Sequence, residues 1–315
     1  MATSTPRQPL RLMETFRSVF YTPIYAAVAG GFLELEGLDV TLTTCAPPFT
    51  HALAALNQDA TDIAQSGIMR SIIACDWGAE TVPVHIAKIN ARDGFFVLAR
   101  QRPEPFGEGF RWESFKGAAV IPVGFSPMPW ASFQSALRRN GVEPWELRLV
   151  PGLPLDQATV AFLGGEGDFI HLPQPAAEQL LATGKAHLAV ALGPVNGHIA
   201  YSSFAATNRF LDARPDAAGS FVRGFARALK WLSENDAATV GAEVAPFFPD
   251  VDPRLVIRSV ERYKAQETWP LRPTLELPEY EGLQDILVDA GLVKERQPYG
   301  NIVRPEFARA TAHLG

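Results

Sequence analysis

The strongest constraint on how this chain folds is the regular alternation of strand-type and helical segments along its first hundred residues. Residues 10–16 and 38–43 are typical of strands. Between them Pro23 opens and Gly37 ends an apolar helical segment at residues 24–35. The pattern continues with helices at residues 51–57 and 68–76 and strands at 62–65, 82–89 and 94–98. Strand–helix–strand units of this size predict a largely parallel sheet with helices on both faces.

A second alternating series follows the polar, proline-bearing residues 101–112. Strands are expected at residues 118–123, 147–150, 168–172, 187–192 and 200–206, and helices at 130–140, 158–163 and 176–182. The C-terminal part is mainly helical, at residues 215–234, 253–264 and 283–290. A chain of 315 residues is long enough for two domains. We therefore expect a two-lobed α/β protein with a helical C-terminal tail. Lobe I comprises residues 1–98 and 200–315, and lobe II is inserted as residues 99–199.

Two facing sheets predict one ligand cleft between the lobes, because ligands of open parallel sheets bind beyond the carboxyl ends of the strands. A net charge of −6, without clustered basic and aromatic residues, excludes nucleic acid as the main partner. Cys45 and Cys75 favour two inert thiols over a disulfide, and no metal-ligand spacing or phosphate-cradling glycine loop occurs. We expect a small-molecule ligand and neither a metal nor a cofactor.

No apolar run approaches the roughly 18–20 residues of a membrane span, so no transmembrane segment is expected. The polar residues 1–9 lack the apolar core of a secretory signal. The sequence as written therefore predicts a cytoplasmic location, or a periplasmic one if a leader has been removed.

Two segments carry a family resemblance. Residues 20–40 read FYTPIYAAVAGGFLELEGLDV and residues 62–67 read DIAQSG. Both resemble solute-binding proteins of the alkanesulfonate, nitrate and thiamine-pyrimidine type. A third landmark of that family, a strand end followed by a polar ligand contact, has an altered counterpart at residues 167–175. The resemblance implies the periplasmic-binding-protein type II fold, with a hinge of two crossing segments near residues 97–101 and 192–200. It also implies delivery of the ligand to an ABC transporter permease.

Two enzyme branches of this family differ from the chain. The thiamine-pyrimidine synthase branch carries a cysteine-rich motif that is absent here. The desulfinase branch uses a cysteine nucleophile in the loop after the first strand, where residues 16–20 contain no cysteine and Ser18 falls near its place. A serine without an evident base replaces a thiolate poorly. The resemblance therefore favours a binding protein, and no catalytic residue is assigned.

Two other functions stay open. The first is a desulfinase-, decarboxylase- or pyrimidine-synthase-like enzyme on the same scaffold, acting on an aromatic or heteroaromatic acid. The missing export signal favours it, and its acid/base would be His51, His85 or His171. The second is a cytoplasmic sensor or regulator.

Most ligand-binding candidates in lobe I lie at strand ends. Ser66, Gly67 and Arg70 begin a helix, where free backbone N–H groups and the helix dipole favour an anion. Arg70 could hold a carboxylate, sulfonate or phosphate through two hydrogen bonds, or instead pair with Asp76 or Glu80 at the surface. A second set is Arg17, Ser18, Phe20 and Tyr21, which offers a cation, a hydroxyl and two aromatic rings. Either ring could equally belong to the core.

In lobe II the candidates are Gly124, Phe125, Ser126, His171 and Gln174. The glycine allows close approach of a ligand, and the serine could contact it or only cap the following helix. The histidine could bond the ligand or be structural. Weaker candidates near the crossing segments are Asp93, His198, Tyr201 and Ser202. Together these side chains predict an anionic or heteroaromatic ligand.

Overall fold

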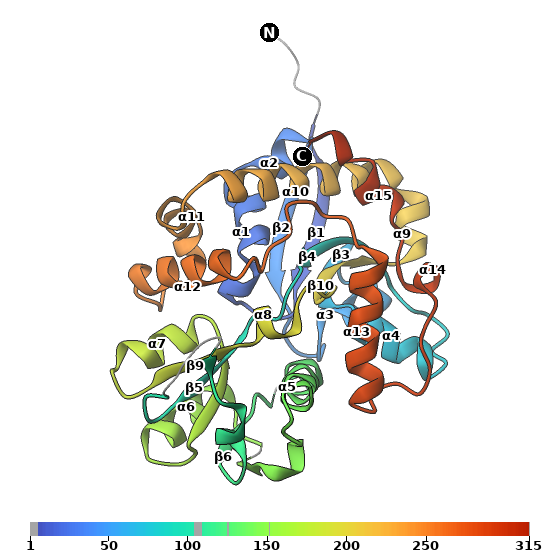
Figure 1. The fold of residues 1–315 in the computed structure, drawn as a ribbon. Helices are drawn as coiled ribbons and strands as arrows, with labels where there is room; N and C mark the ends of the chain where they lie inside the picture. The colour runs from blue at the N-terminus through green and yellow to red at the C-terminus, as the bar shows by residue number, and fades with distance from the viewer. Residues whose placement is uncertain (1–5, 104–108, 125, 151, 315) are drawn as a thin grey trace.

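The computed structural model describes residues 6–103, 109–124, 126–150 and 152–314, and shows two lobes, each built on a five-stranded sheet (Figure 1). The strand order is β2-β1-β3-β10-β4 in the first sheet and β7-β6-β8-β5-β9 in the second. The first sheet contains β1 (Gln8–Glu14), β2 (Leu38–Thr44), β3 (Ile63–Gly67), β4 (Val84–Asn90) and β10 (Ser202–Ala206). The second contains β5 (Phe95–Ala99), β6 (Ala119–Ile121), β7 (Arg148–Leu149), β8 (Phe169–Pro173) and β9 (His187–Ala191).

Each sheet is largely parallel, as expected, but contains one reversed strand. In the first sheet β1 is parallel to β2 and β3, but β10 is antiparallel to β3 and β4. In the second, β6 is parallel to β7 and β8, but β5 is antiparallel to β8 and β9. The reversed strands β5 and β10 are those that enter their sheet from the other lobe. They begin at the edge where the parallel strands end, so they run the opposite way.

The chain crosses between the lobes at residues 91–94 and 197–201, which lie side by side. The backbone N–H of Ile199 donates to Ala91 O at 2.9 Å, and that of Tyr201 donates to Asn90 O at 3.3 Å. Residues 97–99, expected in the hinge, belong instead to β5. We therefore propose that the first lobe boundary falls before Phe95 rather than after residue 98.

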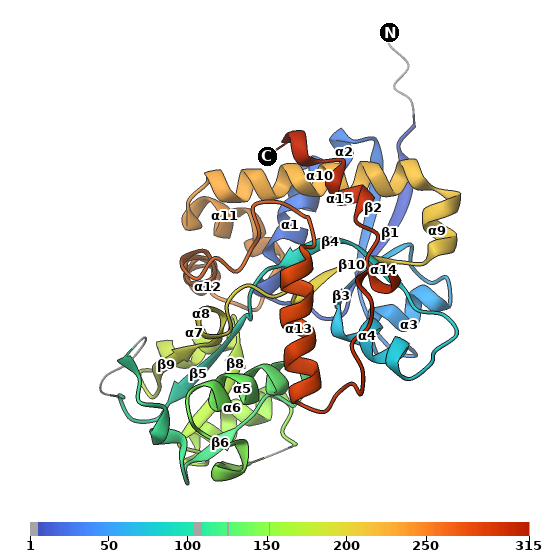
Figure 2. The same cartoon turned by 45° about the vertical axis from the view of Figure 1, so that its right-hand side comes forward.

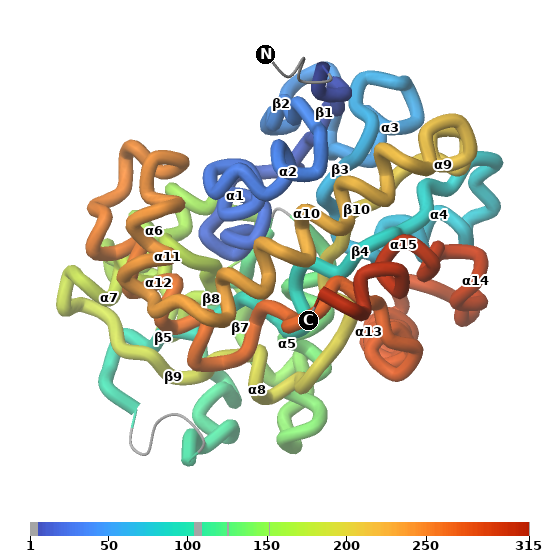
Figure 3. Tube along the Cα trace, turned by 90° about the horizontal axis from the view of Figure 1, so that it is seen from above, coloured from blue at the N-terminus to red at the C-terminus, as the bar shows by residue number. Residues whose placement is uncertain are grey.

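Helices cover the sheet of lobe I. They are α1 (Thr22–Ala29), α2 (Phe32–Leu35), α3 (Ala52–Asn57), α4 (Met69–Asp76), α9 (Asn208–Ala213) and α10 (Pro215–Glu234). Seen from above, α10 runs across this lobe (Figure 3). Under it the ring of Phe204 lies 4.7 and 4.8 Å from those of Phe221 and Phe225. The single helix expected at residues 24–35 is instead the pair α1 and α2, because Gly31 has φ +69°, a left-handed conformation that glycine favours.

Lobe II carries α5 (Pro127–Arg139), α6 (Leu155–Leu163), α7 (Ala176–Ala182) and α8 (Leu192–Asn196). Its core is aromatic, with the ring of Phe115 4.6 Å from Phe169 and 5.4 Å from Phe133. Short 3-10 helices occur at Val19–Tyr21, Trp112–Phe115, Pro144–Glu146, Ala245–Phe247 and Ala312–Leu314.

The C-terminal helices touch both lobes. They are α11 (Ala237–Val244), α12 (Pro253–Ala265), α13 (Leu277–Asp289), α14 (Tyr299–Ile302) and α15 (Glu306–Arg309). Helix α12 packs on α7 of lobe II, and α13 packs on both α4 and α5. Figure 2 shows α13 running beside the lobes down to α5. Among the described residues, no helix is long and apolar enough to cross a membrane.

Candidate functional site

A cavity of about 310 Å³ lies between the lobes. The parallel strands β1 and β3 of lobe I end at this cavity. Strands β5 and β10 begin there, and the first turn of α5 also lines it. Its lining residues are Thr15, Phe16, Tyr21, Thr50, Gln65, Gly67, Met69, Arg70, Phe95, Ser126, Met128, Pro129, Tyr201 and Ser202. Among the described residues, the cavity therefore has one cation, several hydroxyls and a largely aromatic and apolar wall.

Arg70 brings a positive charge to this cavity from the first turn of α4. Its guanidinium has no ion pair within the part of the chain that the structure describes, and burial lowers its pKa. Asp76, a possible surface partner, instead accepts the backbone N–H groups of Lys294 and Glu295, each at 3.0 Å. A half-buried cation without a counter-ion is costly, so an anion in the cavity would stabilise it.

Ser126 lines the cavity from lobe II. It occupies the N-cap position of α5, but its side chain makes no capping hydrogen bond. The hydroxyl is therefore not used by the helix and is free to bind a ligand. Phe125, predicted beside it, lies outside the described residues. Gly124 is exposed and does not line the cavity.

The polar side of the cavity is preorganised by β1 and β3. Gln65 Oε1 accepts the backbone N–H of Thr15 at 2.9 Å, and Thr15 Oγ1 donates to Gln65 O at 2.9 Å. Burial raises the pKa of the neighbouring Tyr21, so its phenol stays protonated. Thr15 follows β1 directly and Gln65 lies inside the DIAQSG segment. A search for ligand residues at the carboxyl ends of parallel strands could therefore have found both.

Comparison with known proteins identifies the family. Residues 19–238 match a family model described as NMT1/THI5 like. The chain belongs to this family. Over 300 residues it is 28% identical to YtlA of Bacillus subtilis (strain 168), which is named as a candidate binding protein. That match covers 95% of this chain and 88% of YtlA.

Solved structures share the fold of this NMT1/THI5-like protein. The alkanesulfonate-binding protein SsuA from Xanthomonas axonopodis pv. citri, bound to MOPS, has a TM-score of 0.71 at 18% identity. That likeness covers 96% of this chain and 99% of SsuA. A mutant of DSZB in complex with biphenyl-2-sulfinic acid has a TM-score of 0.72 at 16% identity, over 98% of this chain and 100% of DSZB. The expected two-lobed periplasmic-binding-protein type II fold is thereby confirmed.

The predicted site residues divide into two groups. Tyr21, Gly67, Arg70 and Ser126 come together around the cavity. Those that do not line it are Arg17, Ser18, Phe20, Ser66, Gly124, His171 and Gln174. Ser66 is buried, with its hydroxyl donating to Gly67 O at 3.2 Å. Phe20 is buried between the rings of Tyr21, Phe95, Tyr201 and Tyr263.

Arg17 and Ser18 have structural partners. Arg17 Nε donates to Glu14 Oε1 at 2.5 Å, and the guanidinium lies over the Tyr25 ring, 5.4 Å from its centroid. Ser18 Oγ donates to Gln174 O at 2.9 Å, which links the two lobes. Gln174 Oε1 in turn accepts the N–H of Glu178 at 3.0 Å.

The histidines considered as acid/base groups do not line the cavity. His51 caps α3, its Nδ1 accepting from Ala54 N at 3.2 Å. His85 contacts Ser71 and Ser203, and His171 lies between the rings of Phe95 and Phe133 at 5.2 Å from each. Burial lowers the pKa of both His85 and His171 to about 3, so both rings are neutral at pH 7.

Proposed function

We propose that this protein is a solute-binding protein that captures a small organic anion between its lobes and presents it to an ABC-type importer. The observation that carries the proposal is Arg70, a half-buried cation without an ion-pair partner among the described residues, facing a cavity with an apolar wall. A guanidinium recognises planar or tetrahedral oxyanions through paired hydrogen bonds. The dipole of α4 places further positive potential at its N-terminal end, which favours the same anion.

The cavity wall favours an anion with an apolar body. Apolar side chains contribute little to the binding of a bare inorganic ion such as nitrate, and the wall includes those of Phe16, Phe95, Met128 and Pro129. A volume of about 310 Å³ lies at the small end for ligand pockets. We therefore propose small sulfonates or carboxylates as ligands. The MOPS bound to the similarly folded SsuA supports a sulfonate.

The lining residues support binding rather than catalysis. Among the described residues around the cavity there is no histidine, carboxylate, lysine or cysteine. A reaction there would lack a general base and a strong nucleophile. Because an importer takes its solute from outside, the proposal places the protein on the outer side of the membrane, with a permease as its partner.

The proposal predicts that Arg70→Gln weakens the binding of small sulfonates and carboxylates by about 10- to 100-fold, as expected for loss of a charge-assisted pair. Binding is measured by isothermal titration calorimetry after a thermal-shift screen, in which a ligand raises Tm according to its concentration over Kd. The control is Arg227→Gln, because Arg227 pairs with Glu36 within lobe I and does not line the cavity.

Two results would contradict the proposal. If Arg70→Gln binds every ligand as tightly as the wild type, the anion is held elsewhere. If mass spectrometry finds that the bound ligand is converted after incubation, the protein is an enzyme.

A further inference from the structure

Gly67 is the only glycine among the described residues that line the cavity, and the fold does not require a glycine there. It ends β3 and is half-buried. Its φ angle lies outside the left-handed region that favours glycine. A Cβ placed on it would lie 3.7 Å from Met69 Cγ and 3.7 Å from Tyr201 O, which is ordinary van der Waals contact. An alanine would therefore fit the protein at this position without strain.

A side chain at position 67 would project into the cavity. Side chains two residues apart point to the same side of a strand, and Gln65, two residues before Gly67, also lines the cavity. Ser202 stands opposite Gly67 in the register of β10 and lines it too. Ser66, which points to the other side of the strand, does not line it. The missing side chain therefore leaves room on the cavity side of β3.

The glycines at the crossing segments have a different reason to be glycine. A Cβ on Gly94 would lie 2.3 Å from the ring of Phe20, and one on Gly193 would lie 2.7 Å from Asp93 O. Both distances are too short for any side chain, so packing of the protein itself requires these two glycines. Neither packing nor backbone conformation requires Gly67. A glycine of this kind marks a place where another molecule approaches the backbone closely.

The cavity wall indicates which part of a ligand lies over Gly67. Arg70 follows only three residues later in the chain and lines the same cavity, so a ligand whose anionic group binds it has its body beside Gly67. The aromatic part of the wall includes Phe16 and Tyr21, whose rings are 5.4 Å apart and meet edge to face. Aromatic walls favour a flat ring, and a bare stretch of backbone gives such a ring room to lie.

Resting on the solute-binding function above, we propose that Gly67 is a specificity-determining residue whose missing side chain admits a flat ring next to the anionic group of the ligand. The ligand class is then an aromatic sulfonate or carboxylate rather than a short alkyl one.

The test compares benzenesulfonate with methanesulfonate, which share the sulfonate and differ in the ring. Gly67→Ala is expected to weaken the binding of benzenesulfonate about 10-fold or more, because the added methyl group overlaps the ring, and that of methanesulfonate less than about 3-fold. Without ligand, the Tm of Gly67→Ala should equal or exceed that of the wild type. Alanine fits the folded protein there and restricts the unfolded chain more than glycine does.

Gly124→Ala is the matched control. A Cβ on Gly124 would lie 3.6 Å from Leu153 O, again ordinary contact, but this residue does not line the cavity. Both affinities of the control should therefore equal those of the wild type.

The inference is overturned if Gly67→Ala lowers Tm, since the glycine would then be structural, or if the variant binds benzenesulfonate as tightly as the wild type. It is also overturned if the affinities for both sulfonates fall equally. When Arg70→Gln weakens sulfonate binding but Gly67→Ala does not discriminate between the two ligands, only this inference fails. When Arg70→Gln has no effect on sulfonate or carboxylate binding, the proposed function fails with it.

Discussion

At the scale of single residues, burial sets the charge of the groups around the crossing segments. Asp93 lies in the first of them, and burial raises its pKa to about 7 although Ser132 and the Phe95 N–H bond its carboxylate. Within the described part of the chain, no cation forms an ion pair with this carboxylate that would offset its burial. The buried histidines His85 and His171 shift in the opposite direction, to about 3. The protein therefore carries opposing pH dependences.

Asp93 is expected to reduce stability as pH rises. Its folded pKa lies above the unfolded value of 3.8, so the folded state binds the extra proton between about pH 4 and pH 7. The free energy of unfolding should fall across that window by about 4 kcal/mol at most. Asp93→Asn should remove this fall, which urea unfolding of both proteins at several pH values measures. A difference between the two proteins that stays constant from pH 4 to pH 7 would refute this role.

The buried histidines His85 and His171 are expected to lower the stability of the protein at acid pH. Their folded pKa values lie below the unfolded value of 6.5, so they stabilise the protein fully above that pH and lose this contribution as pH falls toward 3. We expect the Tm of His171→Phe to fall less between pH 6.5 and pH 4 than the Tm of the wild type. An equal decrease in Tm in both proteins would show that the His171 ring does not cause the loss of stability at acid pH.

At the scale of elements, α12 of the C-terminal tail holds α7 of the inserted lobe. The side chain of Glu178 on α7 is 1% exposed and lies between two arginines of α12. Arg258 Nε is 3.3 Å from Glu178 Oε2, and Arg262 bonds Glu178 Oε1. The backbone N–H of Gln174 donates to the hydroxyl of Tyr263 at 3.2 Å in the same interface. In Figure 1 these two helices lie next to each other across the lobe boundary.

Breaking this contact should loosen the lobes. Glu178→Gln is expected to lower the free energy of unfolding by about 1–2 kcal/mol, below the usual value for a buried pair because both arginines are partly exposed and regain water. A double-mutant cycle with Arg262→Gln measures the coupling. Arg227→Gln, which removes a pair with Glu36 within lobe I, is the control. A coupling energy near zero would mean that the pair does not hold the lobes.

The strands and helices also show how much of the fold could be predicted from the sequence. Apolar periodicity located the strands and most helices within a few residues, because side-chain burial alternates with the backbone repeat. It carries no information on strand direction, so the reversal of β5 and β10 was not foreseen. That reversal also explains two of the cavity-lining residues that were missed or ranked low, whereas Thr15 and Gln65 lie at the ends of parallel strands and were missed without that cause. Seeking ligand residues at strand ends found Tyr21, Gly67, Arg70 and Ser126. It left out Phe95 and ranked Tyr201 low, because both lie where reversed strands begin.

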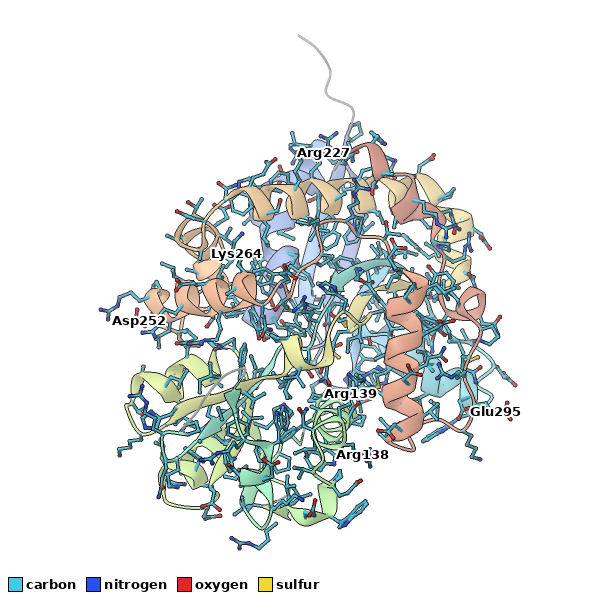
Figure 4. All side chains as sticks on the ribbon, in the orientation of Figure 1. Arg138, Arg139, Arg227, Asp252, Lys264 and Glu295 are labelled. Carbon is cyan, nitrogen blue, oxygen red and sulfur yellow. The ribbon has the colours of Figure 1, made fainter. Side chains whose placement is uncertain are left out.

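At the scale of the whole molecule, the C-terminal tail braces the inserted lobe on two sides. Helix α12 holds α7, and α13 contacts α5, where Arg138 Nη1 is 2.9 Å from Asp289 Oδ2. Figure 4 labels Arg138 on α5, near the lower end of α13. These contacts hold the two lobes together on both sides of the cavity.

The crossing segments have a consequence for how this fold can be rebuilt. The inserted lobe leaves lobe I at residue 94 and returns at residue 197, and the two segments are joined by the bond from Ile199 N to Ala91 O. Its first strand β5 pairs with its last strand β9, so its two ends are neighbours. A gene could therefore gain, lose or exchange this lobe as a single cassette through one point on the surface of lobe I, without cutting any strand of the first sheet.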